Sequence, residues 1–172
     1  MLANLINILD PMTIIKTMGL IGVFFIIFAE SGLFFGFFLP GESLLFTAGF
    51  LASQNYLNIS FLVWGCFVFA VFGDNVGYWF GKKIGPKIFN REDSVFFHKK
   101  HVQSAQNFYE KYGNKTIFLA RFIPIVRTFA PIVAGVGKMK YINFISYNVL
   151  GGFIWVIFLD KLFRESINIF YW

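Results

Sequence analysis

Five ionisable residues lie inside or at the edge of long apolar stretches: Glu30, Glu42, Asp74, Arg121 and Arg127. A charged side chain at the centre of a membrane-spanning helix costs roughly 2.5–3.5 kcal/mol on insertion scales. These residues must therefore pair with one another, contact water or lie near an interface. A purely structural cluster of ion pairs is one interpretation. Buried ion pairs are seldom the most stable way to fill a site, which favours a functional interpretation.

The two arginines are candidate phosphate ligands. Arg121 and Arg127 lie in the segment ArgPheIleProIleValArg, and Pro124 stands between them. The proline predicts a bend in the backbone that lets both guanidinium groups face one cavity. A guanidinium is planar, permanently charged and able to bind an anion through two hydrogen bonds, so two of them at a helix break are typical of a phosphate site.

The glutamates suggest a partner for these arginines. Glu42 directly follows Pro40 and Gly41 at the predicted start of a short helix, where the helix dipole favours an anion. Simple stabilisation of that helix start is the alternative. Glu30 lies within an apolar helix, where desolvation favours the neutral carboxyl and predicts a proton carrier. A phosphate that displaced the carboxylates from the arginines would cause those carboxylates to take up protons. Movement of the anion would then be coupled to movement of protons.

Asp74 accompanies a regular series of glycines. Gly73, Gly77, Gly81 and Gly85 recur every fourth residue. This spacing puts them on one helix face and is typical of close packing between membrane helices. We therefore interpret the glycines as structural, whereas Asp74 beside them suits either packing or the site.

The composition predicts a membrane protein. Of 172 residues, 57% are hydrophobic and only 14% are charged, compared with roughly 25% charged in soluble domains. This excludes a soluble enzyme, a secreted disulfide scaffold and a disordered chain. The single cysteine, Cys66, cannot form an internal disulfide, and a zinc cluster needs more ligands. We expect an all-α polytopic membrane protein with one membrane domain over residues 1–172.

Two apolar segments are interrupted and two are continuous. The interruptions are Pro40-Gly41 in the first broken segment and Pro124 and Pro131 in the second. Because broken backbone cannot face lipid, both breaks should be buried in protein or line a wet cavity. This pattern predicts two re-entrant helical hairpins facing each other, plus spanning helices, as in an inverted-repeat transporter. The predicted elements are an interfacial segment 1–17, a broken segment 18–53, a spanning helix 57–80, a linker 82–115, a broken segment 116–137, a spanning helix 140–160 and a tail 161–172.

The linker 82–115 is strongly basic. It holds eight Lys or Arg against three acids, so the positive-inside rule predicts that it faces the cytoplasm. Nucleic acid is a poor partner for these charges, because the bilayer tethers the linker at both ends. The residues before the first apolar stretch lack a positive region, so we expect no cleavable signal peptide.

An enzymatic function is not expected. His98 and His101 lie within the basic linker, where solvated side chains are the simpler interpretation and a metal site is weak. The apolar segments hold no histidine, and the sequence has neither a GxSxG elbow nor a glycine-rich GKS/T loop. We therefore predict no catalytic residue, no cofactor and no metal.

Three segments resemble the signature stretches of the DedA family. They are PheLeuProGlyGluSerLeu (38–44), GlyAspAsnValGlyTyrTrpPheGly (73–81) and ArgPheIleProIleValArgThrPheAlaProIleValAlaGly (121–135). These bacterial inner-membrane proteins share the VTT domain with eukaryotic lipid scramblases. The resemblance extends from about Gly19 to Leu159. It implies facing re-entrant hairpins and transport of lipid-linked phosphate, notably undecaprenyl phosphate, in dependence on the proton-motive force.

By motif, Glu30 and Glu42 resemble the two essential acidic positions of the family, and Arg121 and Arg127 its essential arginine pair. Family members usually carry a further C-terminal hydrophobic segment, whereas residues 161–172 are too short to cross a bilayer. We expect translocation of undecaprenyl phosphate or a related phospholipid across the bacterial inner membrane, in support of envelope homeostasis. The alternative is a non-transporting membrane organiser held by structural ion pairs. The sequence leaves open the lipid, the direction, the coupled ion and any homo-oligomer.

Overall fold

The computed structural model describes residues 10–33, 39–89, 107, 111–113 and 115–170, without the side chains of some helical residues, Glu42 among them. Over this part of the chain the fold is helical and contains no strand. The helices are α2 (Pro11–Gly32), α3 (Gly41–Ser53), α4 (Ile59–Phe89), α6 (Lys115–Ala120), α7 (Pro124–Val136) and α8 (Tyr141–Phe170).

Within the described residues, three helices are long and apolar enough to cross a membrane: Pro11–Gly32, Ile59–Ile84 within α4, and Tyr141–Lys161 within α8. Helices α3 and α7 have 13 residues each, so each is about 20 Å long and shorter than the roughly 30 Å hydrocarbon core. Large apolar side chains cover the outside of the bundle, with Ile21 76% exposed and Phe61 70% exposed. Such a surface suits lipid and not water, so this is an all-α membrane protein.

Helix α2 begins earlier than the predicted broken segment and has a kink. Asp10 caps it by accepting a hydrogen bond from the Thr13 backbone N–H at 2.9 Å, and Pro11 occupies its first turn. Gly19 interrupts the helical path with a φ of 59°, a conformation that glycine adopts without steric cost. The predicted interfacial segment 1–17 thus contains helix from Pro11 onward. After the kink, the remainder of α2 is as short as α3.

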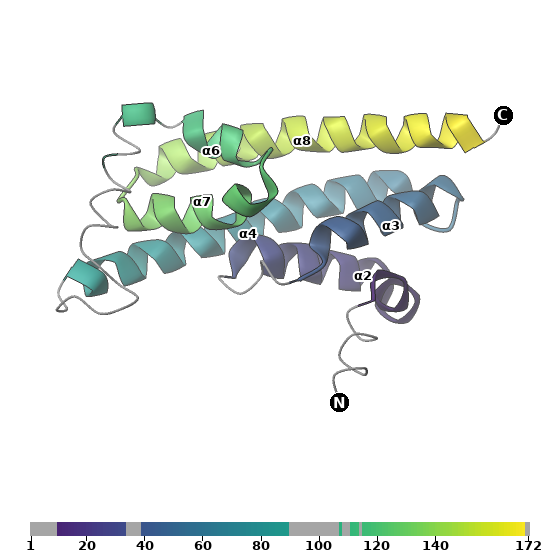
Figure 1. Cartoon of the computed structure of the whole chain (residues 1–172), viewed down its shortest axis with the longest axis horizontal. Helices are drawn as coiled ribbons and strands as arrows, with labels where there is room; N and C mark the ends of the chain where they lie inside the picture. The colour runs from purple at the N-terminus through teal and green to yellow at the C-terminus, as the bar shows by residue number, and fades with distance from the viewer. Residues whose placement is uncertain (1–9, 34–38, 90–106, 108–110, 114, 171–172) are drawn as a thin grey trace.

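Two helix pairs approach each other along α4. Figure 1 shows α2 and α3 folding back on one another from one end of α4, and α6 and α7 doing the same from the opposite end. The first pair is interrupted between Leu33 and Pro40, as the Pro40-Gly41 break predicts. The second is interrupted at residues 121–123, where the chain turns before Pro124 starts α7. The end of α2, the start of α3 and the turn at residues 121–123 all lie near the middle of α4 (Figure 1).

The prediction that Pro131 breaks the second segment is wrong, because Pro131 lies inside the continuous helix α7. A proline removes one backbone hydrogen bond, in this case to the carbonyl of Arg127, and bends the helix without necessarily ending it. Membrane helices tolerate this where neighbouring helices enclose the freed group, and Pro131 is buried. The break falls one proline earlier, since Pro124 has no N–H with which to continue α6.

Helices α4 and α8 are longer than the predicted spans 57–80 and 140–160. Helix α4 continues through Phe89, into the first part of the predicted linker, and α8 continues through Phe170, into the predicted tail. Lysine is a good helix former and its long side chain reaches water from a buried backbone. A helix can therefore extend beyond its apolar stretch, and hydropathy locates the span but not the helix end.

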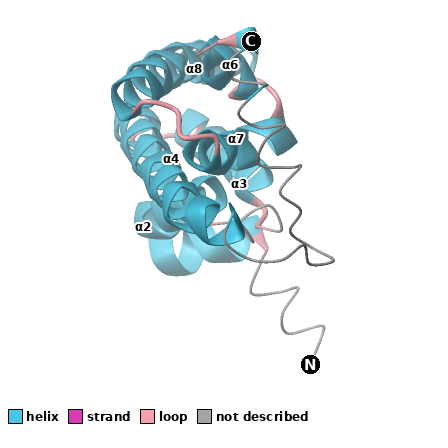
Figure 2. Ribbon diagram, turned by 90° about the vertical axis from the view of Figure 1, so that its left-hand side faces the viewer, coloured by secondary structure: helices cyan, strands magenta, loops and turns pink. Residues whose placement is uncertain are grey.

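Apolar packing divides into two cores. The first joins α2, α3, the first half of α4 and the end of the α8 span; the second joins Tyr78 of α4, helices α6 and α7, and the start of α8. Of the helices described, α4 and α8 alone contribute to both cores. Figure 2, which looks along the bundle, shows α7 beside α4, with α8 and α6 above them and α2 on the far side of α4 from α8.

The glycines of α4 allow its neighbours to approach closely. A Cβ added at Gly73 would lie 2.6 Å from the Phe28 carbonyl oxygen of α2, and one at Gly81 would lie 2.1 Å from the Ile132 carbonyl oxygen of α7. No side chain fits at these two positions. Gly73 and Gly81 therefore allow α2 and α7 to pack closely on α4, in agreement with the interpretation of these two glycines as structural.

Candidate functional site

Polar residues lie where the two apolar cores meet. On α4, Asp74 stands between Ala70 of the first core and Tyr78 of the second. On α8, Asn148 stands between Phe144 of the second core and Val156 of the first. Asp74 is only 5% exposed and Asn148 only 2%. The two long helices thus each place one buried polar side chain in the same layer, at the tips of the two helix pairs.

Arg127 joins the two helix pairs. Its Nη2 donates a hydrogen bond to Glu30 Oε1 at 2.9 Å, and the two side chains are 12% and 9% exposed. The Arg127 guanidinium also lies over the ring of Trp155 of α8, 5.5 Å from its centroid, which is a cation–π contact. Helix α7 is therefore connected to α2 through charge and to α8 through an aromatic face.

The start of α3 lies against the Glu30 carboxylate. A Cβ added at Gly41 would lie 1.5 Å from Glu30 Oε2, so only glycine permits this approach. The Pro40-Gly41 break brings a helix N-terminus, with its partial positive charge, to the carboxylate. Glu30 therefore lies between the Arg127 guanidinium and the first turn of α3. The side chain of Glu42, in that same turn, lies outside the described residues.

Arg121 occupies the turn between α6 and α7. It forms an ion pair with Asp74, and its Nη2 also donates to Asn148 Oδ1 at 2.7 Å. Gly152, one turn along α8 from Asn148, leaves room for the guanidinium, because an added Cβ would lie 2.2 Å from Arg121 Nη1. The absence of a helix at residues 121–123 allows the Arg121 side chain to point inward between α4 and α8.

Three buried donors in this layer have no hydrogen-bond acceptor among the described residues: Arg121 Nη1, Arg127 Nε and Asn148 Nδ2. A buried donor left unsatisfied costs about 1–3 kcal/mol, and more when it is charged. Native structures contain few such groups, and each one calls for an explanation. Two guanidiniums and an amide with unused donors are suited to bind an oxyanion, which accepts hydrogen bonds.

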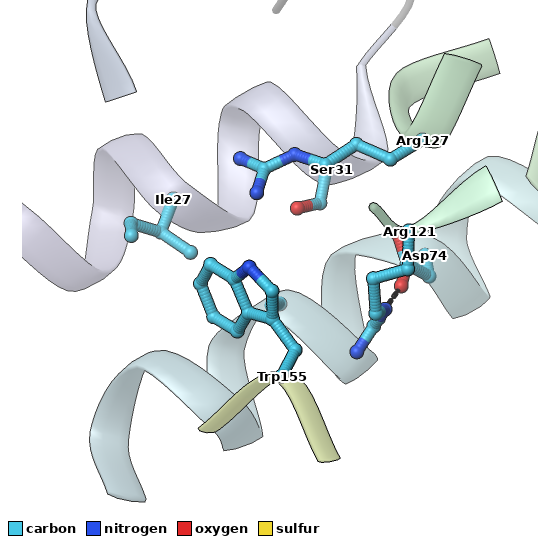
Figure 3. Close-up of a pocket in the computed structure, with 7 residues that line it drawn as sticks. Ile27, Ser31, Asp74, Arg121, Arg127 and Trp155 are labelled. Atoms are coloured by element: carbon cyan, nitrogen blue, oxygen red, sulfur yellow. Dashed lines mark hydrogen bonds and ion pairs between the residues drawn. The ribbon is translucent and has the colours of Figure 1, made fainter. Parts of the chain in front are cut away.

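Two small cavities adjoin the arginines, and Asp74, Arg121 and Arg127 line both. Figure 3 shows the first, where Arg127 extends from α7 toward α2 above Trp155, while Arg121 and Asp74 face each other. Ile27, Ser31 and Ala70 complete this cavity on the side of the first core. The second opens toward the second core. Each has a volume of about 10 Å³, room for roughly one water.

The structure assembles four of the five predicted ionisable residues: Glu30, Asp74, Arg121 and Arg127. Of the predicted supporting residues, Pro40 and Gly41 start α3 beside Glu30, Pro124 starts α7 after Arg121, and Pro131 lines the second cavity. Asp74 pairs directly with Arg121, so it lies together with the predicted site residues.

Sequence reasoning missed Asn148 and Trp155. An amide inside an apolar span is a signal that could have indicated Asn148, since polar groups in such spans seldom lack a partner. Trp155 is seven residues further along α8, on the same helix face. His98 and His101, for which a metal site is the weaker interpretation, lie outside the described residues. Within the described part of the chain, no group of three metal-ligating side chains occurs.

Comparison with known proteins identifies the family. The VTT domain matches residues 39–160, a range that includes Asp74, Arg121 and Arg127 but not Glu30. The chain is 49% identical to Protein DedA of Escherichia coli over 137 residues, which cover 78% of this chain and 63% of that relative. It is 44% identical over 157 residues to an uncharacterized membrane protein of Mycobacterium tuberculosis, covering 87% of this chain and 69% of the relative.

A further uncharacterized membrane protein, from Mycobacterium leprae, is 46% identical over 130 residues, covering 76% of this chain and 58% of the relative. The chain thus spans less than two-thirds of the length of Protein DedA. No solved structure matches. The helical membrane fold, the arginine pair and its carboxylates, and these matches lead to one conclusion: the chain belongs to the DedA family of membrane proteins and contains a VTT domain.

Proposed function

We propose that this protein translocates a lipid-linked phosphate, undecaprenyl phosphate or a related phospholipid, across the bacterial inner membrane in dependence on the proton-motive force. The chief support is the set of three buried donors on Arg121, Arg127 and Asn148 that have no acceptor in the part of the chain that the structure describes. A phosphate headgroup supplies the acceptors that these donors lack. The role is transport and not catalysis, and it supports envelope homeostasis.

The ion pairs suggest how protons take part. Each arginine holds one carboxylate, Arg121 with Asp74 and Arg127 with Glu30. A phosphomonoester carries a charge of about −1.5 to −2 at neutral pH. If it binds between both arginines, two charged carboxylates beside it would repel it, so Asp74 and Glu30 become protonated as it binds. Glu42, at the start of α3, is a third candidate proton carrier.

The two cavities suggest a path. They lie toward opposite cores of the bundle, and the Asp74–Arg121 pair lines both. In the proposed cycle, the two helix pairs are re-entrant hairpins that enter the membrane from opposite sides, and the headgroup passes from one cavity to the other through the arginine layer. Each cavity has room for roughly one water, which is too small for a phosphate group. This conformation is therefore closed, and the hairpins must separate before a phosphate can enter.

The alternative function is a membrane organiser without transport. It is favoured by the fact that both arginines already have carboxylate partners, one joining α7 to α2 and the other fixing the turn before α7 to α4. In that case the charges hold the helices together, and any cation of suitable reach would serve at each arginine.

Arg127→Lys distinguishes the two functions. A lysine keeps the charge and can pair with Glu30, but it cannot offer two parallel hydrogen bonds to a phosphate. The experiment measures binding of a phosphomonoester lipid to purified wild-type and variant protein, together with the thermal midpoint of each. Transport predicts at least a tenfold weaker binding at an unchanged midpoint. Equal binding by both proteins would refute the phosphate site and favour the organiser.

A further inference from the structure

A second cluster of cationic and aromatic side chains lies away from the arginine layer, where α4 leaves its apolar span and α8 begins. Lys82 Nζ lies 4.8 Å from the centroid of the Trp79 ring and 5.9 Å from that of Tyr78. The Trp79 ring contacts Tyr141 of α8 at a centroid distance of 5.6 Å. Lys140 directly precedes α8 and is exposed.

The cluster is held rigidly. Tyr78 is fully buried, stacks on Phe144 at 4.5 Å and donates a hydrogen bond to the Met139 carbonyl at 2.5 Å. The Tyr141 hydroxyl bonds to Asn75 Oδ1 at 3.0 Å. These contacts fix the turn between α7 and α8 against α4. The two lysines therefore extend from a firm base.

The aromatic rings face outward near the ends of the apolar spans of α4 and α8. Trp79 is 53% exposed and Tyr141 is 39% exposed. The apolar span of α4 ends at Ile84, and that of α8 begins at Tyr141. Trp and Tyr at the ends of spans lie at the level of lipid headgroups. Among the described residues, the carboxylates of Asp10, Glu30, Asp74 and Asp160 all lie outside this cluster, so its charge is positive.

We propose that Lys82 and Lys140, together with the exposed faces of Trp79 and Tyr141, bind the headgroup of an anionic phospholipid in the leaflet that meets this end of the bundle. The lysines contact the phosphate, and the rings pack against the glycerol region and the first part of the acyl chains. Charge complementarity selects an anionic lipid, and the aromatic rings at the interface select a lipid over free phosphate. This site is separate from the arginine layer and does not depend on transport.

The test is native mass spectrometry of the purified full chain with phosphatidylglycerol, phosphatidylcholine or inorganic phosphate. All variants are made in the Arg127→Lys background, so that lipid at the central site contributes less and contributes equally to every variant compared. Each lysine near an anionic surface contributes roughly a fivefold gain in affinity. The Lys82→Gln/Lys140→Gln variant should therefore retain phosphatidylglycerol at least about tenfold less, with phosphatidylcholine binding unchanged.

Two controls separate charge from folding. The Lys82→Arg/Lys140→Arg variant should retain phosphatidylglycerol, and so should Lys16→Gln, which removes an exposed lysine from α2. Three results would overturn the proposal: equal retention of phosphatidylglycerol by the double glutamine variant and its parent, equal retention of phosphatidylcholine and phosphatidylglycerol by the parent, or displacement of phosphatidylglycerol by an equal concentration of inorganic phosphate.

Discussion

Arg127 of α7 and Glu30 of α2 are 97 positions apart in the chain, yet their side chains share a hydrogen bond of 2.9 Å. This bond closes the tips of two helix pairs that come from opposite ends of α4. Each pair alone would leave a buried charge without a counterion, which costs several kcal/mol. The assembly of the two pairs and the formation of the charged layer are therefore one event.

Protonation of Glu30 should make binding dependent on pH. In the proposed cycle Glu30 takes up a proton as phosphate binds, so binding by the wild-type protein should strengthen as the pH falls. Glutamine imitates the neutral carboxyl, so Glu30→Gln should bind lipid phosphate at least as well, with a weaker pH dependence. The measurement is lipid-phosphate affinity above about pH 7, where the phosphomonoester stays largely dianionic. If the variant kept the full wild-type pH dependence, Glu30 would not be the coupling group.

Asn148→Asp tests whether Asn148 takes part in lipid-phosphate binding or only in packing. The new carboxylate has the same shape as the amide and can still accept the hydrogen bond from Arg121 Nη2. Its negative charge strengthens the contact with Arg121 but repels an incoming phosphate. We expect lipid-phosphate binding about tenfold weaker, or roughly 1.4 kcal/mol, together with a lower thermal midpoint, because a third buried carboxylate beside Asp74 has no arginine of its own. A lower midpoint with unchanged binding would assign Asn148 to packing alone.

Gly81 and Gly77 of α4 provide a matched pair of positions for a test of stability. An alanine Cβ at Gly81 would lie 2.1 Å from the Ile132 carbonyl oxygen, whereas one at Gly77 would lie 3.5 Å from its nearest neighbours, an ordinary contact. Gly81→Ala should therefore lower the free energy of unfolding by about 1–3 kcal/mol, and Gly77→Ala should be nearly neutral. Thermal unfolding in detergent compares them. Equal effects would mean that α4 and α7 pack less closely than described.

The orientation of the chain can be tested with one cysteine. Cys66 is fully buried in α4, so it should react little with a thiol reagent. Asn107 is exposed within the predicted basic linker. The positive-inside rule predicts that this linker faces the cytoplasm. An impermeant thiol reagent should therefore label Asn107→Cys in opened vesicles but not in intact cells. Efficient labelling of intact cells would reverse the topology.

Charge was the most informative feature of the sequence. Glu30, Arg121 and Arg127 stand out because the cost of burying a charge in lipid exceeds that of almost any other choice. Proline located two of the helix starts, Gly41 after Pro40 and Pro124 itself. The prediction of a helix break at Pro131 is wrong. Whether a proline ends a helix depends on neighbouring helices that enclose the freed carbonyl, and those neighbours are distant in the sequence.

The partners within the site could not be derived from the sequence. Asp74 pairs with Arg121 because the glycines of α4 allow the helix pairs to approach on either side of it, which is a property of the packed bundle. Trp155 carries no insertion cost large enough to mark it among ordinary span residues, and the amide of Asn148 marks that position as polar without indicating its partner. Their roles follow only from their positions beside Arg121 and Arg127.

The most direct test of the proposed transport is a flipping assay with purified protein in sealed liposomes that contain a phosphomonoester lipid. The assay follows the accessibility of the headgroup from outside, with and without a pH difference across the membrane. We expect wild-type protein to move the headgroup faster when the pH difference is present, and Arg121→Lys and Arg127→Lys to remain at the rate of empty liposomes. Wild-type protein that moves no more lipid than empty liposomes, or lysine variants that move as much as the wild type, would contradict transport through the arginine layer.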